Sequence, residues 1–153
     1  MDFQEFVDWS MSEYGYMLTE SVGNKECLWH LEKDIIKPDN KVYSPDMCLF
    51  VPQEVNALFT LSCKSRGEYP IGVSWNKKGK TLEGYARTDA GRKYLGSSGD
   101  PMFLHGLWQI EKVKYIRLIA GKYKQHVKLF EVLNNRADMI QSDHTNHKES
   151  VFL

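Results

Sequence analysis

The sequence predicts an α+β protein, in which a hairpin-helix unit precedes a three-stranded antiparallel sheet packed on a long helix. Three observations predict this class. Extended segments broken by turn residues lead into a short helical segment before residue 60, three more extended segments lie between residues 71 and 96, and apolar residues recur at helical spacing over residues 101–134. Strands and helices are therefore both expected, grouped in separate parts of the chain.

A short helix is expected at the start of the chain. Apolar and aromatic residues recur there at helix-like spacing, namely Phe3, Phe6, Val7 and Tyr14. Gly15 ends the pattern, so the helix is expected over residues 2–14. The polar stretch that follows, up to residue 26, is expected to be a loop.

Two extended segments and a second helix follow. Residues 28–36 (LWHLEKDII) are strand-like, residues 41–44 (KVYS) form a second extended segment, and Pro38-Asp39-Asn40 between them is typical of a turn. Pro52 suits the first turn of a helix, because that position needs no backbone N–H. The helix would turn apolar side chains inward: Val55, Leu58 and Phe59.

Residues 71–153 are predicted to form a sheet, a long helix and a tail. Residues 71–96 contain three extended segments separated by Gly/Lys and Asp/Gly turns. A helical stripe then runs through Leu104, Leu107, Trp108, Tyr115, Ile119, Tyr123, Val127 and Phe130, and Gly121 bends or divides this helix. Residues 137–153 break the pattern and are expected to form a flexible polar tail. The expected divisions are 1–60, 61–136 and 137–153.

Charge is separated along the chain although the net charge is zero. Residues 1–56 carry 4 Lys and Arg against 11 Asp and Glu, net −7, whereas residues 57–136 carry 15 against 6, net +9. A basic segment of this kind is typical of a phosphate-binding surface, and an acidic segment repels DNA unless a divalent cation lies within it. The alternative interpretation is an unevenly charged, solvated surface.

Composition also bears on compartment and metal chemistry. No run reaches the roughly 18–20 apolar residues that span a bilayer, and the first residues carry acids where a signal peptide needs basic ones, so a cytoplasmic location and no membrane partner are expected. Cys27, Cys48 and Cys63 contain no CxxC pair, so they predict buried free thiols and not a four-thiolate zinc site.

A specific motif pattern covers residues 28–59. Its three parts are Trp29, His30, Leu31, Lys33 and Asp34, then Asn40 and Lys41, then Tyr43, Ser44, Pro45, Cys48, Phe50, Val51, Pro52 and Asn56. In these residues the segment resembles the metal-binding half of phage-encoded HNH (homing-type) endonucleases. The resemblance implies a ββα-metal fold for this unit, a bacteriophage protein, and the cytoplasm of the infected bacterium as its location.

The resemblance also implies a site and an activity. In such a unit one Mg²⁺ or Mn²⁺ ion is held by a hairpin carboxylate and a helical amide, which are Glu32 and Asn56 here, and the ion stabilises charge at the scissile phosphate. Lys33 stands where the best-matched nucleases of the family have their base, so His30 is the candidate general base or a further ligand, and a packed, hydrogen-bonded histidine is the alternative. On a strand His30 shares a face with Glu32 and Asp34, so these three are the candidate catalytic residues. The protein would then nick or cleave DNA.

Three positions are unfavourable for an active nuclease of this family. Glu32 stands where the family has Asp, Met47 replaces a frequent Asn, and Lys33 is a cation at neutral pH and so a poor base. The alternative is therefore a catalytically inactive HNH descendant that binds DNA or a host protein, for example a defence protein.

A second resemblance lies in the basic segment. Gly72-Val73, Tyr85-Ala86 and Tyr94-Leu95-Gly96 are similar to the three strands of AP2-type DNA-binding modules. The resemblance implies that alternate side chains of the sheet enter the major groove of double-stranded DNA. The candidate DNA-binding residues are Trp75, Lys77, Lys78, Lys80, Arg87, Arg92 and Lys93. Lysines in hairpin turns are also common as plain solvent-exposed residues, which is the alternative for each of them.

Overall fold

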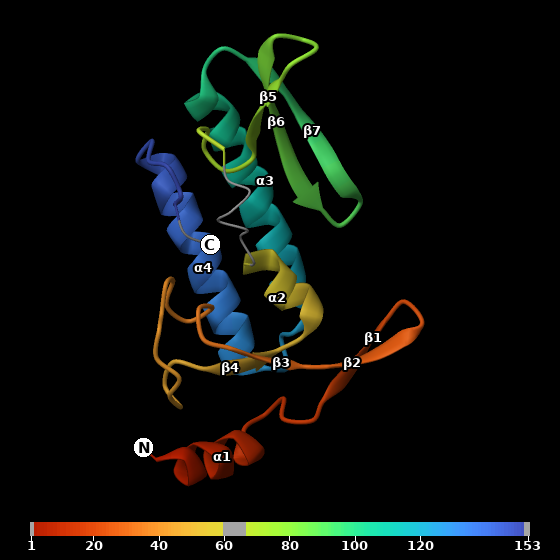
Figure 1. Cartoon of the computed structure of the whole chain (residues 1–153), viewed down its shortest axis with the longest axis vertical. Coiled ribbons are helices and arrows are strands. Elements are labelled where there is room, and N and C mark those ends of the chain that lie inside the picture. Colours follow the sequence, from red (N-terminus) through yellow and green to blue (C-terminus); the bar gives the residue numbers. More distant parts are fainter. Residues whose placement is uncertain (1, 60–66, 152–153) are drawn as a thin grey trace. The chain divides into compact units, whose positions relative to one another are not determined.

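The computed structural model describes residues 2–59 and 67–151 (Figure 1). Within these residues it has four helices and three antiparallel sheets, one of them three-stranded, so the predicted α+β class is confirmed. Contacts divide the described residues into two compact units, 2–59 and 67–151. The expected boundary at residues 60 and 61, and Cys63, lie outside the described residues.

The first unit begins with helix α1 (Phe3–Ser12), close to the predicted helix. Asp2 and Glu5 form a capping box: the Asp2 carboxylate accepts from the Glu5 backbone N–H at 2.8 Å, and the Asp2 backbone N–H donates to the Glu5 carboxylate at 2.9 Å. No residue of α1 is buried, so tertiary packing stabilises this helix little. The capping box therefore contributes a larger part of the helix's stability.

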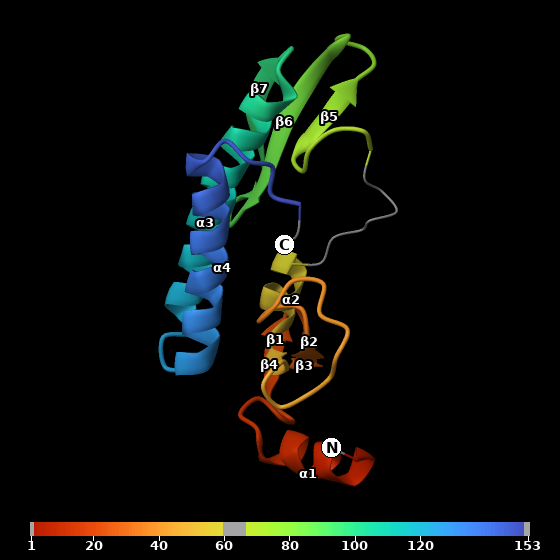
Figure 2. The ribbon, with the colours of Figure 1, turned by 90° about the vertical axis from the view of Figure 1, so that its left-hand side faces the viewer.

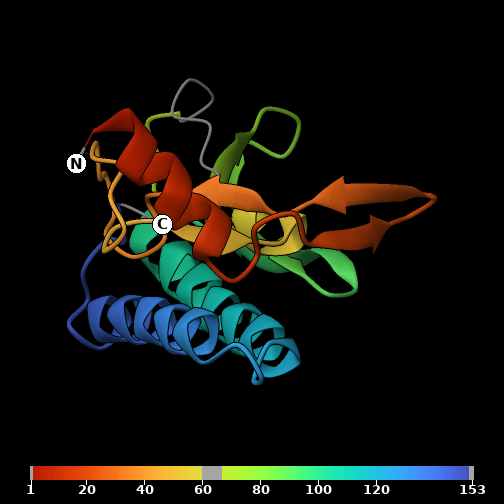
Figure 3. The same cartoon turned by 90° about the horizontal axis from the view of Figure 1, so that it is seen from below.

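A hairpin replaces the loop that was expected before residue 26. Strands β1 (Thr19–Val22) and β2 (Lys25–Leu28) pair antiparallel across a turn at Gly23 and Asn24. Gly23 has φ +63°, a conformation that glycine adopts without steric cost. Most side chains of both strands are exposed, and the hairpin extends away from β3 and β4 of its unit (Figure 3). The prediction failed because the hairpin lacks the alternation that marks a half-buried strand.

The predicted hairpin of residues 28–36 and 41–44 is wrong in its pairing. Strand β3 covers only His30–Glu32, and it pairs with β4 (Leu49–Val51), not with residues 41–44. Helix α2 (Gln53–Phe59) follows β4, as Pro52 predicted, and it buries Val55, Leu58 and Phe59. The unit's core also includes Ile35, Cys48 and Val51, each fully buried. Cys27 is half-buried.

The second unit contains the three-stranded sheet that was predicted. Strands β5 (Val73–Asn76), β6 (Thr81–Thr88) and β7 (Gly91–Ser98) are antiparallel and neighbours in that order. Leu82, Gly84 and Ala86 of β6 face helix α3 (Pro101–Lys122) and are buried. Gly72 precedes β5 with φ +85°, and the Trp108 ring of α3 occupies the space where a side chain would lie. This contact holds the start of the sheet on the helix.

Helix α3 lies between the sheet and helix α4 (Val127–Thr145) within this unit (Figure 2). It therefore buries residues on two sides, which include Leu104, Trp108 and Ile119 of the predicted stripe and also Val113 and Ile116 outside it. The predicted long helix is divided, as Gly121 suggested, but the break covers residues 123–126.

The expectation of an irregular tail from residue 137 is wrong. Helix α4 continues to Thr145, because Leu129, Leu133, Ala137 and Ile140 form a buried stripe at helical spacing. Ser150 beyond the helix is 1% exposed. Phe152 and Leu153 lie outside the described residues. Across the described residues, no helix combines the length and the apolar character needed to cross a membrane.

Candidate nucleic-acid interface and candidate metal site

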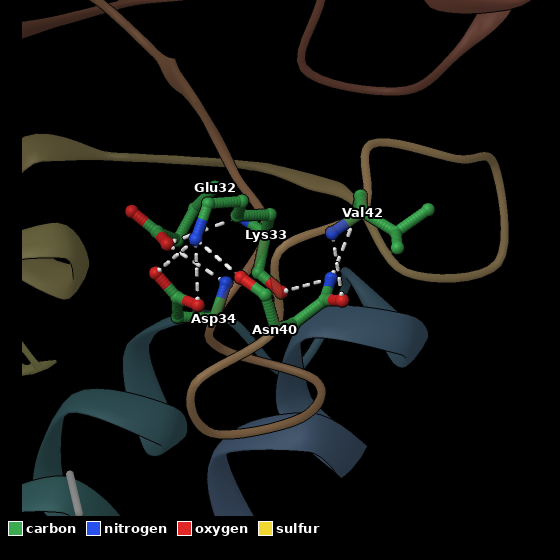
Figure 4. A network of polar contacts seen from close by, with 5 residues as sticks. All are labelled: Glu32, Lys33, Asp34, Asn40 and Val42. Atoms are coloured by element: carbon green, nitrogen blue, oxygen red, sulfur yellow. Dashed lines mark hydrogen bonds and ion pairs between the residues drawn. The ribbon is translucent and has the colours of Figure 1, made fainter.

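The predicted catalytic carboxylates lie in a network that closes the loop after β3 (Figure 4). One oxygen of Glu32, Oε1, accepts from the backbone N–H groups of Lys33 and Asp34, at 3.0 and 2.9 Å. The Lys33 and Asp34 N–H groups thus bond a side chain and not a neighbouring strand, so strand β3 ends at Glu32 and a turn begins. Asp34 lies in the resulting turn, so the expected shared strand face of His30, Glu32 and Asp34 does not extend to Asp34.

Lys33 and Asp34 form an ion pair at the same place. The Lys33 ammonium lies 2.8 Å from both carboxylate oxygens of Asp34 and also donates to the carbonyl of Asn40. The hydrogen bond to Asp34 raises the pKa of Lys33 above its usual value, so this side chain stays a cation and is a poor base. Asp34 is thereby satisfied by a cation of the protein itself.

Asn40 holds the two ends of the loop together. It is 8% exposed, and its Nδ2 donates to the carbonyls of Lys33 and Val42 at 3.0 and 2.8 Å. Its Oδ1 accepts from the Val42 N–H at 3.0 Å. These side-chain bonds take the place of the backbone pairing that was predicted between residues 28–36 and 41–44. The motif residue Asn40 therefore has a structural role in this loop.

The remaining predicted catalytic and metal-binding residues, His30 and Asn56, lie on different elements. His30 is an exposed residue at the start of β3 opposite Val51, and Asn56 is half-buried in α2. Within residues 2–59 and 67–151, no three His, Cys, Asp or Glu side chains are grouped so that they could hold a metal ion. A two-ligand site of Glu32 and Asn56 therefore stays a prediction.

The sheet of the second unit has one face turned away from α3. Residues opposite one another in antiparallel strands point to the same side, so the register with β6 assigns each side chain to a face. The face opposite α3, here called the outer face, carries Ser74, Asn76, Glu83, Tyr85, Arg87, Arg92, Tyr94 and Ser97. Two of the predicted DNA-binding residues, Arg87 and Arg92, lie on it.

An arginine–tyrosine cluster forms the centre of the outer face. The Arg92 guanidinium lies 3.8 Å from the centroid of the Tyr85 ring, and the rings of Tyr85 and Tyr94 are 5.4 Å apart. Arg87 lies directly opposite Arg92, and two like charges at such positions destabilise a sheet. A depression of about 420 Å³ lies over Tyr85, Arg87, Gly91 and Arg92. The cluster therefore offers an anion two cations and an aromatic ring in one place.

Among the described residues, Glu83 is the one acidic side chain on the outer face. It fixes the positions of two neighbouring side chains through hydrogen bonds. Its two oxygens accept from Asn76 Nδ2 at 2.7 Å and from the Tyr85 hydroxyl at 2.9 Å. The bond to Glu83 raises the pKa of Tyr85, so its hydroxyl remains a donor. Glu83 thereby fixes the ring on which Arg92 lies.

The other predicted DNA-binding residues take different positions. Lys93 points to the α3 side, where its ammonium lies 2.8 Å from the Glu111 carboxylate. Trp75 shares the side of Leu82 and is 48% exposed because β5 is an edge strand. Lys77, Lys78 and Lys80 are exposed in the β5–β6 turn.

That turn is ordered by a side chain of the outer face. The Oδ1 of Asn76 accepts from the backbone N–H groups of Lys78 and Gly79, at 2.9 and 3.1 Å. Asn76 therefore joins the lysine turn to Glu83 and the cluster. Sequence reasoning missed Asn76, Tyr85 and Tyr94 as members of one surface. Alternation along β6 could have indicated Tyr85, but Tyr94 depends on the register of β7 and its bulge at residue 95.

Comparison of the chain with protein-family models, with curated proteins and with solved structures returned no match.

Proposed function

We propose that the protein binds double-stranded DNA through the outer face of the β5–β7 sheet. The observation that carries the proposal is the Arg87–Arg92 pair: two cations directly across from each other, one of them lying on Tyr85. Their mutual repulsion is relieved when an anion binds between them, and a phosphate or a guanine edge suits arginine best. Lys77, Lys78 and Lys80 in the adjoining turn add contacts to the backbone.

Neighbouring residues of β7 provide a matched test. Arg92 points to the outer face, whereas Lys93, the next residue, points to the α3 side and pairs with Glu111. Fluorescence anisotropy with a labelled duplex should show binding weakened about tenfold by Arg92→Gln or Arg87→Gln, equivalent to about 1.4 kcal/mol. The Lys93→Gln variant removes the same charge and should change affinity much less. Equal losses in all three variants would contradict binding by the outer face.

Salt dependence gives an independent measure. Each lost phosphate contact should lower the slope of log affinity against log salt by about 1. The Arg92→Gln slope should therefore be shallower than that of the wild-type protein, while the slope of Lys93→Gln should not change.

We propose that this protein binds DNA without cutting it, as an HNH-like descendant. Support comes from Asp34, whose carboxylate is paired with Lys33, and from Glu32, which accepts two backbone bonds. Supercoiled plasmid should stay intact with the purified protein in Mg²⁺, in Mn²⁺ and in EDTA. Metal-dependent nicking that disappears in Asn56→Ala would instead establish the nuclease and give Glu32 and Asn56 their predicted roles.

A host-protein partner is the second candidate function, favoured by one observation. Large apolar side chains are exposed in residues 2–59, among them Phe3 at 82%, Met17 at 65% and Val42 at 59%. Exposed apolar side chains are typical of protein-binding surfaces where they gather into one patch. An Arg87→Gln/Arg92→Gln double variant, defective in DNA binding, should still capture a host protein from a bacterial lysate, and Phe3→Ser with Met17→Ser should lose it. If DNase treatment abolishes every capture, this candidate is wrong.

A further inference from the structure

The second unit contains a cleft between the first turns of α3 and the end of α4. Its volume is about 480 Å³, within the range of about 300–1,000 Å³ that small-molecule sites occupy. The lining residues come from Asp100, α3, α4 and the segment after α4, and they differ from those of the depression on the outer face. A ligand here would therefore not compete directly with DNA on the sheet.

One wall of the cleft is apolar. It consists of Met102, Phe103, Leu107 and Ile110 of α3. Phe103 is 56% exposed and Met102 39% exposed, so a flat apolar group placed against them removes apolar surface from water, which favours binding. The wall therefore suits the apolar body of a ligand.

The imidazole of His144 lies beside Gly106 at the base of this wall. A Cβ at Gly106 would lie 3.4 Å from Cε1 of His144, an ordinary van der Waals distance. The imidazole of His144 therefore lies against α3, where it lines the cleft.

Gln109 orders the polar side of the cleft. It is 2% exposed, and its Nε2 donates to the Lys148 carbonyl at 2.9 Å and to Ser150 Oγ at 3.0 Å. Both N–H groups are thus used, so Oε1 is the acceptor for Nδ1 of His144, 3.3 Å away. One buried amide holds both His144 and the segment that carries Lys148.

His147 occupies a backbone position that glycine usually takes. The His147 N–H bonds the His144 carbonyl at 3.1 Å and the Lys148 N–H bonds the Asp143 carbonyl at 2.8 Å, the two bonds of a Schellman motif after α4. His147 has φ +53°, a left-handed conformation that is strained for a residue with a Cβ. Such strain is concentrated at functional sites, and here it places an imidazole at the cleft.

We propose that this cleft binds an aromatic monocarboxylate. The aromatic body lies against Phe103, Leu107 and Ile110, and the carboxylate lies between the imidazole of His147 and the ammonium of Lys148. Asp100 lines the cleft as well, and its carboxylate already accepts from the Met102 and Phe103 N–H groups. A second negative group on the ligand would be repelled there, so the ligand carries a single anionic end.

The first test uses 2-naphthoate and its neutral analogue 2-naphthamide with the 153-residue chain. Amide chemical shifts followed by NMR during titration should move in a saturable way at Phe103, Gly106 and His147. The carboxylate should bind about tenfold more tightly than the amide, equivalent to about 1.4 kcal/mol. Equal binding of the two probes, shifts centred on Tyr85 and Arg92, or no saturation below about 1 mM would overturn the proposal.

Variants separate a ligand site from a merely structural loop. His147→Gly should raise the melting temperature, because the strain is removed, and should weaken 2-naphthoate binding at least threefold. Lys148→Gln should also weaken it, whereas Lys124→Gln, an equal change of charge outside the cleft, should leave it unchanged. If His147→Gly stabilises the protein and binds the probe as well as the wild-type protein does, the imidazole has no role and the proposal fails.

Discussion

Burial lowers the pKa of one charged side chain strongly, that of Lys112 in α3. This residue is 9% exposed, and burial, with the nearby charges of Arg87 and Arg136, lowers its pKa to about 8. The unfolded chain keeps a value near the usual one, so between about pH 8 and pH 10.5 the unfolded state binds more protons than the folded state. The contribution of Lys112 to stability therefore rises with pH across this window.

Lys112→Met should be more stable than the wild-type protein at pH 7, by at most about 3 kcal/mol. The difference should shrink as the pH rises from 8 to 10, because Lys112 then becomes neutral in the folded protein. Urea unfolding at several pH values measures it, and the wild-type-minus-variant difference removes the effects of other titrating groups. A difference that does not change with pH would show that burial does not perturb this ammonium.

Asn40→Ala should destabilise the first unit. The change leaves the Val42 N–H and the carbonyls of Lys33 and Val42 without their side-chain partner, at a cost of about 1–3 kcal/mol. Denaturant unfolding followed by tryptophan fluorescence, which includes Trp29 of this unit, measures the loss. Asn24→Ala, in the exposed β1–β2 turn, is the matched control and should change stability by less than about 0.5 kcal/mol. Equal effects of the two would contradict the role of Asn40.

At the scale of elements, the start of α3 depends on its cap. Asp100 Oδ1 accepts from the backbone N–H groups of Met102 and Phe103, at 2.9 and 3.2 Å, and Pro101 takes the first helical position. Asp100→Ala should lower the unfolding free energy by about 1 kcal/mol, and Asp100→Ser should restore most of it. Thermal unfolding checks both, and similar losses in Ala and Ser would show that the cap contributes little.

Elements with local signals were predicted well. Strands β5–β7 are each bounded by turn residues, and Pro52 marks the start of α2. The pairing of β3 failed, because Glu32 and Asn40 bond backbone groups through their side chains and so divert the chain from the nearer partner. The end of α4 failed for another reason: its buried stripe contains only Ala137 and Ile140 after residue 136, too few to outweigh its polar composition.

At the scale of the whole molecule, the charge asymmetry is divided between the two units. Residues 2–59 carry 4 Lys and Arg against 11 Asp and Glu, net −7, and residues 67–151 carry 14 against 9, net +5. The acidic unit should therefore weaken the proposed DNA binding by the basic unit through long-range repulsion.

Neutralising two exposed loop acids tests this. Asp39→Asn/Asp46→Asn should tighten duplex binding about two- to threefold in low salt, and the gain should disappear near 1 M salt, where charges are screened beyond about 3 Å. Asn is well suited to position 39, because Asp39 has φ +54°, a conformation that Asn tolerates. Anisotropy titrations at several salt concentrations measure the effect. A gain that persists at high salt would indicate a direct contact and not long-range repulsion.

The residues of the candidate DNA-binding face could be predicted in part from local sequence, but their arrangement depends on how distant strands pair. Arg87 and Arg92 could be chosen from composition, because a basic β-strand is a local property. Three features depend on strand register, including the β7 bulge at Leu95 opposite Gly84 and Tyr85: the position of the two arginines opposite each other, the stacking of Arg92 on Tyr85, and the absence of Lys93 from the outer face. A shift of register by one residue would reverse every one of these assignments.

The sequence by itself determined the α+β class, the segregation of charge, the three strands of the basic unit and the start of α2, because spacing, turn residues and charge are properties of neighbouring residues. Only the tertiary structure decided which strand pairs with β3, that Asp34 is bound by Lys33, and that α3 and the end of α4 enclose a cleft lined by His147. These features join residues that are distant in the chain, or they depend on the hydrogen bonds of one side chain. Hydrophobic periodicity predicts only local secondary structure, so it could not predict them.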